Sequence, residues 1–129
     1  MDEKKFRKAM ESASVFSHVA SQFNIGHPTL PSCFLEVDNL GVKKDVLYIF
    51  EGKHKNESAA IQQLKVRYQS LLLFRHVYVN HLLPAYSTIK LYFYSLAKHS
   101  IVEYDSKGKK ITSMKFADVP ELINILRNI

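Results

Sequence analysis

The chain has 129 residues, of which 47% are hydrophobic and 23% charged, and its net charge is +6. This length suits one domain with a single hydrophobic core, and the composition excludes an intrinsically disordered protein. The single cysteine, Cys33, excludes an intrachain disulfide and a multi-cysteine zinc site. The basic balance favours a polyanionic partner such as nucleic acid.

The sequence shows neither the pattern of a secretory signal nor that of a membrane-spanning segment. The chain starts with charged residues that lead into no apolar run, which argues against a secretory signal. Its most apolar stretch, residues 71–83, is interrupted by Arg75, His76, Asn80 and His81, and is too short and polar to span a bilayer. We therefore expect one domain over residues 1–129, cytoplasmic (intracellular), with no membrane partner.

The first segment has the spacing of an amphipathic helix. Apolar residues recur at three- and four-residue steps, which predicts a helix over residues 3–23: Phe6, Met10, Ala13, Phe16 and Ala20. Residues 24–32 contain Gly26, Pro28 and Pro31 and are predicted to form a loop.

A hairpin is predicted next. Residues 33–40 are apolar and extended in character, and residues 46–50 are rich in β-branched and aromatic side chains. Turn and solvent-facing residues are expected from the end of the first run onward: Asn39, Gly41, Lys43 and Lys44. The two runs and their short connection indicate an antiparallel pair.

The rest of the chain alternates between segments with helical spacing and segments with the character of β-strands. Residues 57–74 carry an apolar helical stripe, residues 88–96, 100–104 and 110–116 read as strands, and residues 119–128 form a closing helix. Asp118 is its predicted N-cap, with Pro120 in the first turn. The predicted fold class is α/β (α+β), with a mixed central sheet flanked by helices.

Acidic and basic residues follow the two strands of the hairpin. Side chains two positions apart share a face of a strand, so Glu36 points with Asp38, and Glu51 points with Lys53. If the strands pair, these groups meet beside one another. Paired carboxylates are ligands that Mg²⁺ prefers, and a lysine nearby can orient a water or hold a phosphate oxygen. The pattern is typical of metal-assisted phosphodiester hydrolysis.

The alternative interpretation is that these residues are ordinary surface charges. A solitary Glu-x-Lys is most often a solvated pair. Here, however, Glu51 directly follows the five apolar residues 46–50, where burial is expected. A buried charge is costly unless it is paired or bound to a metal. The position therefore favours a functional site.

These residues resemble the motif of the PD-(D/E)XK nuclease superfamily. Asp38 stands on one strand, and residues 46–53 end in Glu51-Gly52-Lys53 after the next, while Val37 replaces the usual proline. The resemblance covers roughly residues 33–96 and is closest to restriction-endonuclease-like members. It implies an αβββαβ-type core and an Mg²⁺-dependent nuclease, with Mn²⁺ expected to substitute.

The resemblance also implies roles for individual residues. Asp38 and Glu51 would bind the metal, and Lys53 would position or deprotonate the attacking water. Family members often carry a glutamine on the following helix, and helical spacing places Gln63 and Arg67 on one flank of the apolar stripe. Gln63 is the predicted fourth catalytic residue, although boundary residues are an equally good reading of that pair.

Further contacts are expected around this core. Glu36 is a candidate second or alternative metal ligand. Some members of the superfamily add an acid from the first helix, where this chain has Glu11, although solvation is the better reading for that residue. The predicted nucleic-acid contacts are basic residues that flank the site in sequence: Lys43, Lys44, Lys55 and Arg67.

The expected partner is DNA, with RNA, endonuclease or exonuclease action, and a homodimer all compatible with the sequence. Two other functions remain open. The first is a catalytically silent nuclease-fold module that binds nucleic acid or another partner through its basic face. The second is a structural or protein-interaction domain whose charge is incidental.

Overall fold

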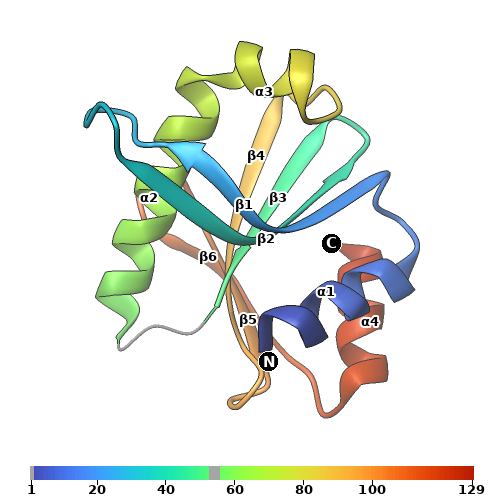
Figure 1. Cartoon of the computed structure of the whole chain (residues 1–129). Helices are drawn as coiled ribbons and strands as arrows, with labels where there is room; N and C mark the ends of the chain where they lie inside the picture. Colours follow the sequence, from blue (N-terminus) through green and yellow to red (C-terminus); the bar gives the residue numbers. More distant parts are fainter. Residues whose placement is uncertain (1, 53–55) are drawn as a thin grey trace.

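A computed structural model describes residues 2–52 and 56–129. Within this part of the chain, a six-stranded sheet has its strands in sequence order, and helices lie on both of its faces (Figure 1). The helices are α1 (Asp2–Ala13), α2 (Glu57–Leu73), α3 (Arg75–His81) and α4 (Val119–Asn128). The strands are β1 (His18–Gly26), β2 (Phe34–Lys43), β3 (Val46–Glu51), β4 (Thr88–Ser95), β5 (Ser100–Tyr104) and β6 (Lys110–Lys115).

The sheet is antiparallel except at its centre, where β3 and β4 run parallel. A parallel pair needs a crossover connection, and α2 and α3 supply it. Both central strands are buried on both faces, which is why β3 reads as an almost unbroken apolar run. The predicted fold class, a mixed sheet flanked by helices, is confirmed at this level.

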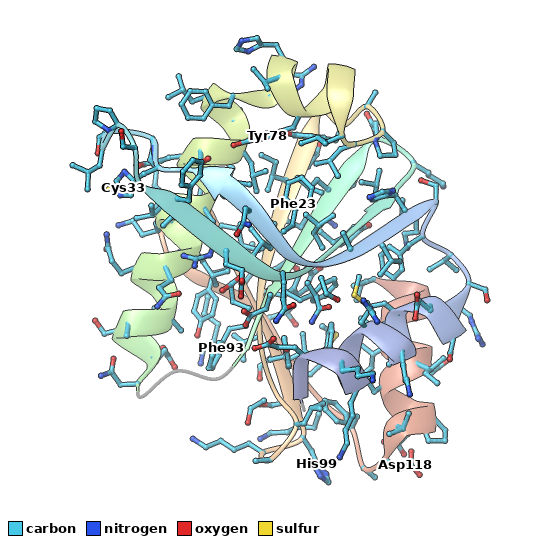
Figure 2. The ribbon with its side chains drawn as sticks, in the orientation of Figure 1. Phe23, Cys33, Tyr78, Phe93, His99 and Asp118 are labelled. Carbon is cyan, nitrogen blue, oxygen red and sulfur yellow. The ribbon has the colours of Figure 1, made fainter. Side chains whose placement is uncertain are left out.

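Two hydrophobic clusters cover the two faces of the sheet. Alternate residues of β3 divide between them: Leu47 and Ile49 face the cluster that holds α2 and α3, and Tyr48 and Phe50 face the one that holds α1 and α4. Figure 1 shows α2 on one side of the sheet and α1 and α4 together on the other. Figure 2 shows Phe23 of β1 near Tyr78 of α3, whose rings lie 6.2 Å apart.

The predicted first helix is too long. It ends at Ala13, Ser14 takes a positive φ of 59°, and residues 18–26 form β1 instead of continuing the helix. The strand pairs with nearly the whole of β2, so it satisfies backbone groups that would otherwise form an open edge. Phe16, counted in the helical stripe, packs edge-on against Tyr48 from the connecting segment. Tertiary pairing thus outweighs the local pattern.

The turn of the hairpin lies further along the chain than predicted. Strand β2 continues through Gly41 to Lys43, and the reversal occurs at Lys44, whose φ is 58°. Gly41 is needed as glycine because a Cβ there would lie 2.7 Å from the Met10 Cε. Its role is close packing of α1 on the strand, and the sequence reads this as a turn signal.

The remaining predicted elements agree with the structure within a residue or two. Helix α2 begins behind Asn56, whose side chain accepts a hydrogen bond from the Ala59 N–H at 2.8 Å. Asp118 is the N-cap of α4, as predicted, and accepts from the Glu121 N–H. Helix α3 was not predicted. No helix in the described residues has both the length and the apolar character that a membrane crossing requires.

Candidate active site at the end of strand β3

Glu51, the last residue of β3, has a buried carboxylate with only 1% of the residue exposed. Its Oε2 accepts a hydrogen bond from the Asp38 backbone N–H at 3.0 Å. Its Oε1 lies 3.3 Å from the Arg67 Nε of α2. The carboxylate is thus held by groups from β2 and α2.

Asp38 lies beside Glu51 because the register of β2 and β3 places the two residues opposite each other, just beyond the last paired residues of the two strands. The last recorded pair is Asn39 with Phe50, so Asp38 stands opposite Glu51 in the same register. Side chains replace the backbone bonds at this point: Asp38 donates its N–H to Glu51, and the Asp38 Oδ2 accepts from the Gly52 N–H at 2.6 Å. The structure therefore brings together the two acids that the sequence singled out.

Gly52 has no room for a side chain. A Cβ there would lie 2.9 Å from the Asp38 Oδ2 and 3.3 Å from the Tyr94 hydroxyl. We expect Gly52→Ala to displace the Asp38 carboxylate and to destabilise the fold by about 1–3 kcal/mol, the usual cost of overpacking. Thermal unfolding measures the loss. Gly26→Ala is the control, because its Cβ would meet only the Phe74 ring at 3.7 Å; equal losses in the two variants contradict this account.

The environment of Glu51 is unfavourable for its negative charge. Burial raises the pKa of this carboxyl from 4.5 to about 8, and the nearby charges of Asp38 and Glu3 act in the same direction. Arg67 and the Asp38 N–H lower the pKa, but do not balance burial. Burial is thus the main obstacle to ionisation, and a further cation beside the carboxylate would favour the ionised form.

This shift makes stability depend on pH in a defined direction. Between pH 4.5 and about 8 the unfolded chain releases the Glu51 proton while the folded protein keeps it, so unfolding becomes easier as pH rises. We expect the wild type to lose stability relative to Glu51→Gln from pH 5 to pH 8, at about 1.4 kcal/mol per unit of pKa difference. Urea titrations of both proteins at several pH values measure it; parallel curves contradict the raised pKa.

Three residues that sequence reasoning did not select for the site complete the surroundings. One of them, Asn39, was predicted to be a turn or solvent-facing residue, but it lies within β2 and is buried. The buried Asn39 donates from Nδ2 to the Glu3 carbonyl at 3.1 Å and lies 3.4 Å from the Tyr94 hydroxyl. Burial and the charge of Asp38 raise the pKa of Tyr94, so its phenol stays protonated. The charge of Glu3 in α1 acts on Glu51, whereas Glu11, the acid considered from this helix, is exposed near its other end.

Only Asn39 offered a signal that sequence reading can use. An amide within an apolar strand, next to Asp38, is an unusual core residue and indicates a hydrogen-bonding role. Glu3 and Tyr94 reach the site through the packing of α1 and β4, which no local pattern encodes.

Arg67 is buried and tied to the site, with 8% of the residue exposed. Besides its ion pair with Glu51, its Nε and Nη2 donate to the Glu36 carbonyl at 3.1 and 2.9 Å, and its Nη1 donates to the Gln63 carbonyl at 3.2 Å. The guanidinium thus contacts one carboxylate and two backbone carbonyls. The sequence had predicted that it contacts a phosphate instead. Arg67 positions Glu51.

Glu36 and Gln63 lie around this group, with their backbone carbonyls engaged. The Glu36 side chain is exposed, and the half-buried Asp38 is the acid of β2 that contacts Glu51. Gln63 is half-buried one helical turn before Arg67. Their predicted roles as metal ligand and as water-holding amide stay predictions.

The predicted basic contacts are divided. Lys43 and Lys44 lie at the turn end of the hairpin, some five residues or roughly 17 Å along β2 from Asp38. Lys43 is half-buried, donates to the Ile129 carbonyl and lies over the Tyr48 ring. The structure does not bring these two lysines to the carboxylates. Lys53, the predicted catalytic lysine, and Lys55 lie outside the described residues.

The donor chemistry of Asp38 and Glu51 fits a divalent cation such as Mg²⁺. Among the described residues, no group of three or more histidine, cysteine or acidic side chains has an arrangement that could hold a metal. Mg²⁺ does not require such a cage, since it commonly takes one or two carboxylates and completes its shell with waters and phosphate oxygens. The raised pKa of Glu51 is consistent with a site that needs an added cation.

Comparisons with protein-family models, with curated proteins and with solved structures gave no match.

Proposed function

We propose that the protein is an Mg²⁺-dependent nuclease that hydrolyses DNA phosphodiester bonds, with a catalytic core related to that of restriction-endonuclease-like PD-(D/E)XK enzymes. The single observation that carries the proposal is the contact of Asp38 with Glu51 at the end of β3, with Lys53 two residues further along the chain. The net charge of +6 suits a DNA partner.

The order of elements supports the same proposal. A helix, three antiparallel strands, a helical crossover and a strand parallel to the third follow one another from α1 to β4. This order is similar to the αβββαβ core that the motif resemblance implies, with two helices, α2 and α3, in the crossover. Asp38 lies on the second strand of that unit and Glu51 closes the third, which is where the motif requires its two acids.

In the proposed reaction, water attacks the phosphorus, the bond to one bridging oxygen breaks, and that oxygen leaves with a proton. Asp38 and Glu51 would hold the cation, which when bound supplies acidity to water and charge stabilisation to the phosphate. Lys53 would orient the attacking water or accept its proton. Gln63 would hold the water or a phosphate oxygen. Arg67 keeps the Glu51 carboxylate in place.

A second candidate function is a catalytically silent module of the same fold that binds nucleic acid. The ion pair between Arg67 and Glu51 favours it, because an internal cation already lies 3.3 Å from one of the carboxylate oxygens. In such a module the arginine would take the place of the metal, so catalysis would be lost and binding of nucleic acid through basic residues would remain.

A plasmid-nicking assay distinguishes the two functions. The nuclease proposal predicts that the wild type converts supercoiled plasmid to nicked or linear forms with Mg²⁺ or Mn²⁺, and that a chelator stops the reaction. Binding without cleavage in both Mg²⁺ and Mn²⁺ supports the silent module. A gel-shift at low salt with no bound DNA contradicts both and favours an interaction domain.

A further inference from the structure

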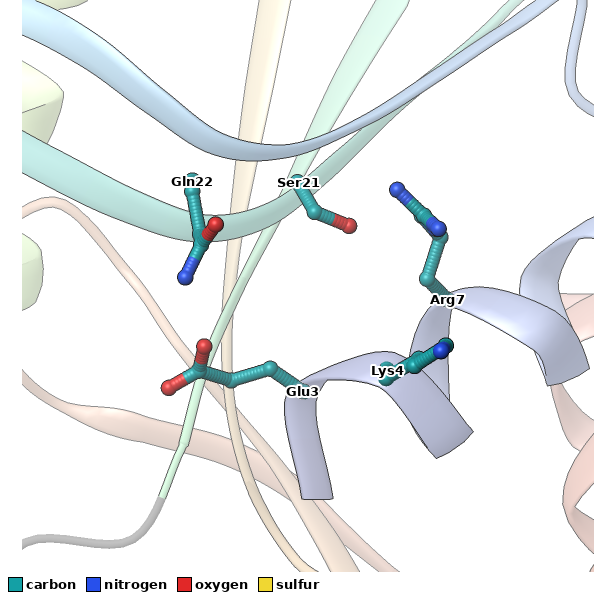
Figure 3. Close-up of a pocket in the computed structure, with 5 residues that line it drawn as sticks. All are labelled: Glu3, Lys4, Arg7, Ser21 and Gln22. Atoms are coloured by element: carbon teal, nitrogen blue, oxygen red, sulfur yellow. The ribbon is translucent and has the colours of Figure 1, made fainter. Parts of the chain in front are cut away.

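A small pocket lies beside the candidate active site, between α1 and β1. Its volume is about 210 Å³, and Figure 3 shows the residues that line it: Glu3, Lys4, Arg7, Ser21 and Gln22. Arg7 extends from α1 toward Ser21, and the Glu3 carboxylate lies near the Gln22 side chain. The pocket therefore has two cationic side chains, a hydroxyl, an amide and one carboxylate around it.

Backbone register and hydrogen bonds connect this pocket to Asp38. Ser21 pairs with Asn39 and Phe23 pairs with Val37, so Gln22 stands opposite Asp38 across β1 and β2. The Asn39 side chain joins both walls, because its Oδ1 accepts from the Ser21 hydroxyl at 2.7 Å and its Nδ2 donates to the Glu3 carbonyl. A ligand in the pocket would lie one strand away from Asp38.

Gln22 interrupts the strand at this point. Its φ is 51°, a left-handed conformation that a non-glycine residue adopts at an energetic cost. The pairs on either side keep the same register, so the distortion is confined to the residue opposite Asp38. With this backbone conformation, the Gln22 side chain lines the pocket.

Arg7 carries an unused donor. Its Nε is buried and has no hydrogen-bond partner among the described residues. An arginine in this state suits an oxyanion, because the guanidinium presents several N–H donors in one plane that match a phosphate group. Lys4, one helical turn earlier and exposed, adds a second positive charge at the pocket. The Glu3 carboxylate points away from these cations and toward Gln22. Its charge also acts on Glu51.

We infer that this pocket binds a backbone phosphate of the DNA strand, adjacent to the phosphodiester held at Asp38 and Glu51, with Arg7 as its principal contact. The inference rests on the proposed function. A phosphate bound in this pocket would fix the position of the strand and so determine which phosphodiester reaches the two carboxylates.

The test measures binding of a fluorescent DNA duplex by anisotropy at several salt concentrations, with a chelator present so that no strand is cut. Loss of one phosphate contact lowers the salt slope by about one unit. We expect Arg7→Gln to show that change with an affinity loss of about tenfold at low salt, which corresponds to about 1.4 kcal/mol. Arg7→Lys should retain most of the slope.

Lys8→Gln is the matched control, because Lys8 is an exposed cation of the same helix that does not line the pocket. Circular-dichroism melts show whether each variant is folded. If Arg7→Gln is not, Lys4→Gln takes its place in the comparison with Lys8→Gln, because Lys4 is an exposed cation that lines the pocket. Equal slopes for the Arg7→Gln and Lys8→Gln variants overturn the phosphate pocket.

A parallel nicking assay with Mg²⁺ separates this inference from the nuclease proposal. A wild type that nicks plasmid, with an Arg7→Gln slope equal to that of Lys8→Gln, keeps the nuclease and rejects the pocket. A reduced Arg7→Gln slope in a protein that never nicks keeps the pocket and rejects catalysis. A wild type that binds no duplex at low salt rejects both.

Discussion

Glu51→Gln should reduce plasmid cleavage on the order of 10³-fold while leaving DNA binding intact. The substitution keeps the shape of the side chain, and its one remaining oxygen can accept from either the Asp38 N–H or Arg67, although the amide nitrogen cannot accept from the other. It removes the charge with which Glu51 would share a cation with Asp38, and effects of this size are typical when an electrostatic contact to the transition state is lost. Initial rates of nicking at saturating Mg²⁺ measure the effect.

Binding and a second acid provide the controls for this variant. Anisotropy in chelator should show unchanged or slightly tighter DNA binding, because a negative charge near the backbone is removed. Glu11→Gln removes an exposed carboxylate from α1 and should cleave like the wild type. A Glu51→Gln protein that cleaves at the wild-type rate places the chemistry elsewhere.

Arg67→Met should destabilise the protein by about 3 kcal/mol at pH 8. Breaking a buried ion pair from one side leaves the other charge without compensation, which typically costs 3–5 kcal/mol. The Glu36 and Gln63 carbonyls also lose their donors. The loss should be smaller at pH 5, because this pH lies below the Glu51 pKa of about 8, so the folded protein holds a neutral carboxyl there.

A double variant isolates the charge of Glu51 in this effect. Arg67→Met combined with Glu51→Gln should lose less stability at pH 8 than Arg67→Met alone, because no buried charge remains unpaired. Lys65→Met, from the same helix but only half-buried, should change stability by only about 0.5 kcal/mol. Urea unfolding measures all of these. Additive losses in the double variant indicate that the two side chains are not coupled.

The pairing of Asp38 with Glu51 could be predicted because it depends on local rules. Alternation along two strands and a short connection place their polar ends together, whatever the details of the turn. The turn itself lies at Lys44 and not at Gly41, yet the two acids still meet. Chain segments with strong periodicity, such as α2 and β3–β5, were predictable for the same reason.

What could not be predicted depends on contacts between distant segments. Strand β1 is a strand because β2 offers an edge to pair with, although residues 18–23 have helical spacing. The helix before it therefore ends at Ala13. The packing of α1 brings Glu3, not Glu11, to Glu51, and β4 brings Tyr94 to Asn39. Arg67 was expected to contact phosphate and instead contacts Glu51, because the packing of α2 on the sheet places its guanidinium beside that buried carboxylate.

The most direct test of the shared cation is a titration with Mn²⁺, in which electron paramagnetic resonance reports the concentration of free ion. It requires no substrate and no turnover. The proposed site predicts that the wild-type protein at pH 8 takes up Mn²⁺, that added Mg²⁺ displaces it, and that Asp38→Asn and Glu51→Gln each abolish the uptake. Equal uptake by all three proteins, or none by the wild type at millimolar ion, would contradict a metal centre on these two carboxylates.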